Sequence, residues 1–137
     1  MSRMLTFIPI ALLSACQTME PRTEVLIVTR STSGGQALFR GSIEARAGCL
    51  VAVSGDRIAT VLFDPGVRLA SDEGIIEANT DRAIKFGAKL EGASAILREN
   101  GSGWQLTDLE QYFGVTIPKT CPSDNVMRLR DMVILEE

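Results

Sequence analysis

The sequence predicts an all-β domain with one short helix. Three observations support this: short apolar and β-branched runs recur along the chain, turn residues separate them at close spacing, and a single segment has helical periodicity. A small closed barrel of the OB-like Greek-key kind is the favoured architecture, and a β-sandwich is the alternative. Closure suits a small domain because exposed strand edges invite aggregation. A chain of 137 residues suits one such domain.

The first two predicted strands lie on either side of a glycine-rich loop. Residues 25–29 (VLIVT) are β-branched and nearly all apolar, which predicts a strand buried on both faces. Residues 31–35 (STSGG) predict the loop. Partial alternation over 37–45 predicts the second strand, and Gly41 inside it marks a bulge or a barrel corner.

The strongest local signal is a hairpin. Two apolar runs, 49–53 and 57–63, are separated by the turn residues Ser54-Gly55-Asp56. Asp64-Pro65-Gly66 then ends the second run, because proline presets a turn and glycine tolerates the positive φ that follows.

The middle of the chain predicts shorter strands, at 67–69, 75–78 and 83–90. Residues 93–97 leave the choice of element open. Asn100-Gly101 is a clear turn signal.

The segment 106–113 (LTDLEQYF) predicts one short helix, since its apolar residues share one face. Thr107 and Glu110 have the spacing of a capping box, and Gly114 can end the helix. The last segment, 126–135, alternates and then becomes wholly apolar, which predicts a closing strand.

The first fifteen residues predict a signal peptide. Arg3 and the amino terminus supply positive charge, and the apolar run 4–13 is too short to cross about 30 Å of hydrocarbon. Leu13-Ser14-Ala15-Cys16 resembles the lipobox of bacterial lipoprotein precursors. The resemblance implies cleavage before Cys16 and lipidation of its thiol. An ordinary secretory signal with a chance cysteine and a buried N-terminal helix are the alternatives.

This interpretation divides the chain into a signal peptide (1–15), a lipidated cysteine with a polar tether (16–23) and a β-barrel-like domain (24–137). In enteric-type lipoproteins an aspartate after the cysteine favours retention in the inner membrane. Gln17 stands there in this chain, so the resemblance implies an outer-membrane protein that faces the periplasm.

Assigning Cys16 to lipid leaves Cys49 and Cys121, an even pair in an oxidising compartment. A disulfide between them would tie the first half of the domain to its end. Two buried free thiols are the alternative, because Cys49 lies beside an apolar run.

Several short motifs occur in an order similar to that of a group of small bacterial envelope β-domain proteins. The motifs are Gly41-Ser42-Ile43, Gly48-Cys49-Leu50, the run 61–66 (VLFDPG), the run 86–92 (FGAKLEG) and Cys121. The resemblance implies a compact β-domain and supports the disulfide, and it carries no activity. Phe63 and Asp64 stand where that group often has a tryptophan.

Composition excludes several function classes. The chain has no histidine, which removes the Ser-His-Asp triad and the commonest metal ligand. A net charge of −3 argues against nucleic acid as a partner. No cofactor or metal site is predicted. The carboxylates that could serve hydrolysis or calcium binding all lie in predicted turns, where such residues cap the backbone: Asp56, Asp64, Asp72, Glu73 and Asp81.

Three residues are candidates for contact with a partner. Trp104 follows an exposed turn, although aromatic residues at the spacing of Trp104, Tyr112 and Phe113 usually pack in a core. Arg128 and Arg130 share a face of the last strand, where they meet an anionic partner or form a solvated surface.

The sequence favours a lipid-anchored envelope protein with a non-catalytic binding or scaffolding domain. Another envelope protein or a cell-wall component is the expected partner. The alternative is a carboxylate-dependent hydrolase of envelope polymers. A carrier of small ligands is a third possibility, and it requires an apolar cavity inside the barrel.

Replacing the predicted lipidation site tests the anchor. We expect Cys16→Ser to move the protein from the membrane fraction to the soluble fraction, because the serine hydroxyl cannot take the thioether-linked lipid. Fractionation followed by immunoblotting measures the shift. Cys121→Ser is the control, since it keeps Cys16 and should stay with the membrane. Retention of the Cys16→Ser protein in the membrane fraction would refute the anchor.

Overall fold

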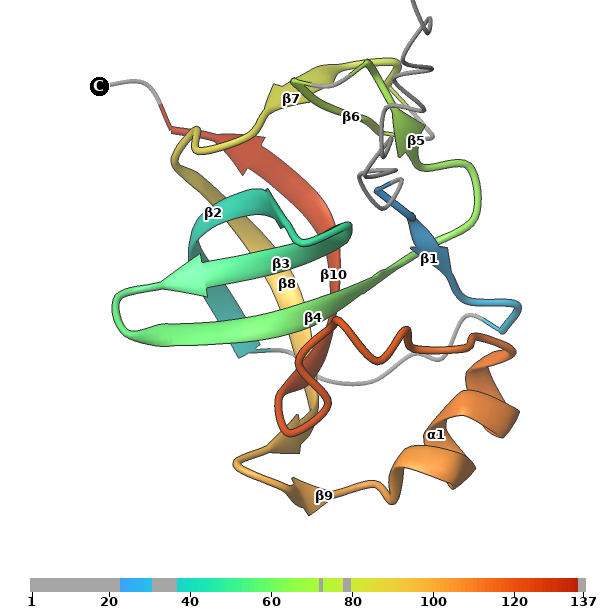
Figure 1. The fold of residues 1–137 in the computed structure, drawn as a ribbon. Helices are drawn as coiled ribbons and strands as arrows, with labels where there is room; N and C mark the ends of the chain where they lie inside the picture. Colours follow the sequence, from blue (N-terminus) through green and yellow to red (C-terminus); the bar gives the residue numbers. More distant parts are fainter. Residues whose placement is uncertain (1–22, 31–36, 72, 78–79, 136–137) are drawn as a thin grey trace, which may run out of the picture.

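A computed structural model describes residues 23–30, 37–71, 73–77 and 80–135 (Figure 1). It confirms the predicted class, because strands dominate and one short helix is present. Cys16, the loop at 31–35 and Asp72 lie outside the described residues. Within the described ranges no helix is long and apolar enough to cross a membrane.

The described chain has these elements: β1 (Leu26–Ile27), β2 (Ala37–Arg46), β3 (Cys49–Ser54), β4 (Arg57–Phe63), β5 (Arg68–Leu69), β6 (Gly74–Ile76), β7 (Ala83–Lys85), β8 (Leu90–Glu99), β9 (Ser102–Gly103), α1 (Leu106–Phe113) and β10 (Val126–Ile134).

Five strands close into a ring. β2, β3 and β4 pair in sequence, β10 pairs in parallel with β4, β8 pairs with β10, and β2 pairs with β8 to complete the circle. The last strand therefore lies between β4 and β8, which is the Greek-key order of an OB-like barrel. This small closed sheet is the favoured prediction, and the β-sandwich alternative does not apply.

Gly41 is where β2 changes partner. Residues 37–41 of β2 pair with β8, and residues 42–46 pair with β3. A Cβ built on Gly41 would lie 2.1 Å from the carbonyl oxygen of Val53, so only glycine allows the two backbones to come this close. The predicted barrel corner at Gly41 is confirmed.

One end of the barrel is covered by a separate small sheet of β5, β6 and β7 (Figure 1). Its residues Ile75 and Ile84 are fully buried with Phe63 and Leu129 of the barrel interior. We call this the covered end. The opposite end, where β3 turns into β4, is called the open end.

A second apolar cluster lies on the outer face of β3 and β4. Leu109 and Phe113 of α1 pack there against Val51 and Leu62. The predicted disulfide joins Cys49 to Cys121 in the same cluster, with the two Cα atoms 5.5 Å apart. It attaches the start of β3 to the segment that follows α1.

Some predicted boundaries were wrong. The strand predicted over 83–90 is two elements, because the chain turns at Gly87 with a φ of 84° and β8 begins only at Leu90. The open choice at 93–97 is settled as part of β8. The strand predicted at 25–29 is shorter and only alternately buried, since Leu26 and Val28 are buried and Ile27 is partly exposed.

The helix has the predicted bounds, but its N-terminus is capped differently from the prediction. Gln105 is the N-cap and makes no side-chain cap bond, so Thr107 and Glu110 form no capping box. The carboxylate of Glu110 instead accepts a hydrogen bond from the backbone N–H of Ile117, at 2.8 Å. Gly114 ends the helix with a φ of 68°, as expected.

Removing the disulfide should destabilise the domain. The bridge closes a loop with a sequence separation of 72 residues, and a loop of that length stabilises a domain by about 4 kcal/mol in the chain-entropy model. We expect Cys49→Ala/Cys121→Ala to lower the free energy of unfolding by about 2–4 kcal/mol. Urea unfolding monitored by circular dichroism measures this. Reduced wild-type protein should show the same loss, and equal stability of the oxidised wild type and the double variant would contradict the expectation.

Candidate functional site

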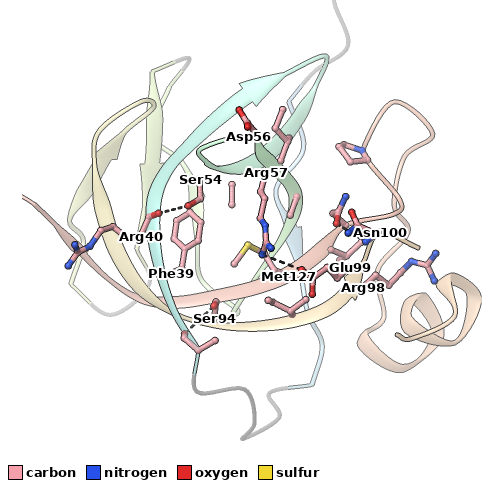
Figure 2. Close-up of a pocket in the computed structure, with 18 of the residues that line it drawn as sticks. Phe39, Arg40, Ser54, Asp56, Arg57, Ser94, Arg98, Glu99, Asn100 and Met127 are labelled. Atoms are coloured by element: carbon pink, nitrogen blue, oxygen red, sulfur yellow. Dashed lines mark hydrogen bonds and ion pairs between the residues drawn. The ribbon is translucent and has the colours of Figure 1, made fainter. Parts of the chain in front are cut away.

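The open end of the barrel contains a cavity of about 550 Å³ (Figure 2). Its walls come from the first half of β2, the β3–β4 turn, the second half of β8 and the segment that enters β10. The volume is within the range of about 300–1,000 Å³ that small-molecule sites occupy.

The cavity exists because inward-facing side chains at this end are small. In β3, Ala52 is the next inward-facing residue after Leu50. In β4, Ala59 is the inward-facing residue before Val61. Ala and Ser also stand on the neighbouring strands. The small residues that line the cavity are Ala37, Ala52, Ser54, Ala59 and Ser94. Large side chains fill the covered end, so the interior is packed there and hollow here.

Larger apolar side chains form the rest of the lining. Phe39 and Met127 are buried within it. Ile96 of β8 faces inward like Leu90 and Ser94 of the same strand. It is nevertheless 52% exposed, because it borders the cavity. Leu38, beside the opening, is 70% exposed. Apolar surface is therefore accessible both inside the cavity and at its mouth.

The two hydroxyl groups in the wall are already engaged. Ser54 Oγ donates to the carbonyl oxygen of Arg40 at 2.8 Å, and Ser94 Oγ donates to that of Ala37 at 3.1 Å. Because each hydroxyl has one proton to donate, neither wall serine has a donor left for a ligand. The cavity interior thus favours a hydrocarbon group.

Charged side chains surround the mouth. Arg57 of β4 and Glu99 of β8 form an ion pair at 3.2 Å between two strands that are not neighbours in the ring (Figure 2). Arg98 donates to the carbonyl oxygens of Ser123 and Trp104. These contacts hold the β3–β4 turn and the segments around β8 in place about the opening.

Trp104, a predicted partner contact, does not line this cavity. It is 38% exposed, and its ring centroid lies 5.2 Å from that of Tyr112 and 5.6 Å from that of Phe113. It borders a separate shallow hollow beside α1, together with Arg30 and Tyr112. The aromatic group therefore serves the packing of α1, and its role in partner binding stays a prediction.

Arg128 is not at the surface, which corrects both sequence interpretations of its role. The side chain is 5% exposed, and its Nη2 lies 3.0 Å from Oδ1 of Asp64. Its guanidinium also lies 5.9 Å from the ring centroid of Phe113. Arg128 thus anchors the turn after β4 to β10, whereas Arg130, also named as a partner contact, is partly exposed.

The turn carboxylates that the structure describes do not gather into a site. Asp81 pairs with Arg68 at 3.7 Å, and Asp64 pairs with Arg128. Among the described residues, no three His, Cys, Asp or Glu side chains are grouped to hold a metal ion. The calcium set that includes Asp72 lies partly outside the described ranges.

The cavity was missed from the sequence. Its signal is the alanine and serine residues at inward positions of four strands. The alternation along each strand shows which residues share a face. Which residues share a layer depends on the register between strands, and the sequence alone does not give that register.

The buried ion pair provides a test of the fold around the site. We expect Asp64→Asn to lower the free energy of unfolding by about 2 kcal/mol, because it removes the negative charge that lies 3.0 Å from Nη2 of the buried Arg128. Urea unfolding measures the change. The matched variant Arg130→Gln, on the same strand, should change stability by less than about 0.5 kcal/mol. Equal effects of the two variants would show that the Asp64–Arg128 pair does not stabilise the fold.

Comparison with family models, with curated proteins and with solved structures gives no match for the chain. Function is therefore inferred from the chemistry of the site, because a fold alone does not imply one.

Proposed function

We propose that this protein is a lipid-anchored protein of the bacterial cell envelope whose barrel binds an apolar group in its open end, without catalysis. The apolar cavity lined by small inward-facing residues carries the binding part of this proposal. The signal-like segment 1–15 and the Leu13-Ser14-Ala15-Cys16 motif support the anchor. The proposed location is the outer membrane, facing the periplasm.

Burial of apolar surface supplies the binding energy. Each Å² of apolar surface removed from water contributes about 25 cal/mol. A ligand in the cavity would cover Ile96 and part of Leu38, which are exposed without it. It would also contact the buried wall at Phe39 and Met127 without displacing packed side chains.

The chemistry at the mouth favours binding over the alternative of carboxylate-dependent hydrolysis. Glycoside hydrolysis needs two carboxyl groups with different roles, one of them a proton donor in a desolvated setting. Asp56 and Glu99 are the carboxylates that line the cavity among the described residues. Glu99 is held in an ion pair with Arg57 and is half exposed, and Asp56 is exposed on the β3–β4 turn.

An anchored binding domain also suits the expected partners. The lipid would hold the domain close to the membrane, so that other envelope proteins or cell-wall components meet it at high local concentration. A carrier of small apolar ligands would use the same cavity, and the probe experiment below applies to it equally.

Filling the cavity tests the binding site. We expect the neutral dye N-phenyl-1-naphthylamine to bind the wild-type protein with increased fluorescence, and Ala52→Leu to weaken binding at least about tenfold by occupying the space. Ala45→Leu is the matched control, because Ala45 is on β2 but exposed. Fluorescence titration measures both affinities.

The same titration can refute the proposal. If the dye does not bind, or binds Ala52→Leu as tightly as it binds the wild type while both remain folded, the open end is not an apolar binding site. Loss of dye binding in Ala45→Leu would also show that the dye does not bind in the open end, because Ala45 lies outside the cavity.

A further inference from the structure

We propose that the open end binds an extended, uncharged apolar peptide segment, which adds as a strand to the free edge of β2 and places a side chain in the cavity. This rests on the proposed function and names the ligand class for that same site. Three features carry it: an unpaired backbone edge, the cavity beside that edge, and the charge balance of the mouth.

The free edge follows from the register of β2. On one side, residues 37–41 pair with β8. On the other side, pairing with β3 begins only at Ser42, opposite Val53, because β3 ends at Ser54. The first half of β2 therefore has one edge that no strand of the described chain covers.

Two side-chain hydrogen bonds show which backbone groups face this edge. The carbonyl oxygen of Ala37 accepts from Ser94 on β8, and that of Arg40 accepts from Ser54 on the opposite side. Because backbone groups alternate along a strand, the N–H and C=O of Leu38 and the N–H of Arg40 point to the side away from β8. These three groups can pair with an added strand.

The cavity lies directly beside this edge. Leu38, Phe39 and Arg40 line it together with Ser54 and Arg57 of the β3–β4 turn. Side chains of an added strand would alternate between the two faces of the sheet, so that every second residue could enter the cavity. An apolar side chain suits the interior, because the wall hydroxyls donate to backbone carbonyls.

Charge decides between a peptide and an ionic amphiphile. The mouth and its ion pairs hold three arginines (Arg40, Arg57 and Arg98) and three carboxylates (Asp56, Glu91 and Glu99). Their formal charges cancel, so the head group of a fatty acid or of a cationic lipid would meet no net opposite charge. A neutral peptide backbone needs hydrogen-bonding groups instead, and the edge of β2 supplies them.

The experiment uses acetyl-Thr-Val-Thr-Leu-Thr-Val-Thr-amide as the probe peptide, titrated against the protein with bound N-phenyl-1-naphthylamine. We expect the peptide to displace the dye and to slow hydrogen exchange at the amides of Leu38 and Arg40, measured by ¹H–¹⁵N NMR. Displacement by n-dodecyl maltoside but not by the peptide would overturn the inference in favour of a neutral amphiphile.

A proline substitution isolates the edge. Leu38→Pro removes an N–H that faces away from β8, so the existing β2–β8 ladder keeps its bonds. Compared with Leu38→Val, which keeps the N–H, we expect Leu38→Pro to bind the peptide about tenfold more weakly, because one hydrogen bond is lost, and to bind the dye with the same affinity. Both variants lose the leucine side chain at the mouth of the cavity, so the comparison between them isolates the effect of the N–H. Equal peptide affinity of Leu38→Pro and Leu38→Val would overturn the inference.

A modified peptide covers the case in which Leu38→Pro no longer binds the dye. Two modified peptides are used: one is N-methylated at the valine and leucine residues, and the other at the threonines. Each keeps all side chains and loses the N–H donors along one of its two edges. We expect one of the two methylated peptides to bind the wild-type protein at least about tenfold more weakly. If both methylated peptides bind as tightly as the parent peptide, the strand model is overturned.

The outcomes separate this inference from the proposed function. If the dye binds the wild type, Ala52→Leu excludes the dye and no peptide binds, this inference fails and the proposed function stands. If the dye does not bind, the proposed function fails as well.

Discussion

The close approach of β2 to β3 at Gly41 is the constraint on which the rest of the barrel depends. The carbonyl oxygen of Val53 occupies the place where any other residue would have its Cβ, at 2.1 Å. At that point β2 leaves β3 and joins β8, which closes the ring. The same change of partner separates the first half of β2 from the β3–β4 turn. Closure of the barrel and the uncovered edge in the first half of β2 therefore have a single geometric cause.

The two ends of the barrel differ in how they meet the requirement for close packing. At the covered end, Ile75 and Ile84 of the small sheet pack onto Phe63, and the Asp64–Arg128 pair holds the adjoining turn. At the open end alanine and serine take several of the inward positions, which leaves apolar surface such as that of Ile96 uncovered. Such surface costs stability unless something binds it, so it indicates a functional site. The disulfide and α1 stabilise the outer wall and leave the cavity free.

Local signals predicted most of the elements, and contacts distant in sequence explain the failures. The hairpin around Gly55, the bounds of α1 and the Cys49–Cys121 bridge needed only turn chemistry, periodicity and cysteine counting. The strand predicted over 83–90 ends before Gly87 because that glycine has a positive φ, and the sequence does not reveal the sign of a glycine's φ in advance. The burial of Arg128 depends on Asp64, 64 residues away, and no strand pattern shows such a pair.

The central claim is that an apolar ligand occupies the open end, and intermolecular nuclear Overhauser effects test it most directly. With N-phenyl-1-naphthylamine bound to methyl-labelled protein, dye protons should show contacts to the methyl groups of Ala52, Ala59 and Ile96, which line the cavity. The aromatic hollow at Trp104 and Tyr112 should show none. Contacts confined to that hollow, or a bound dye without contacts to the three methyl groups, would contradict the claim.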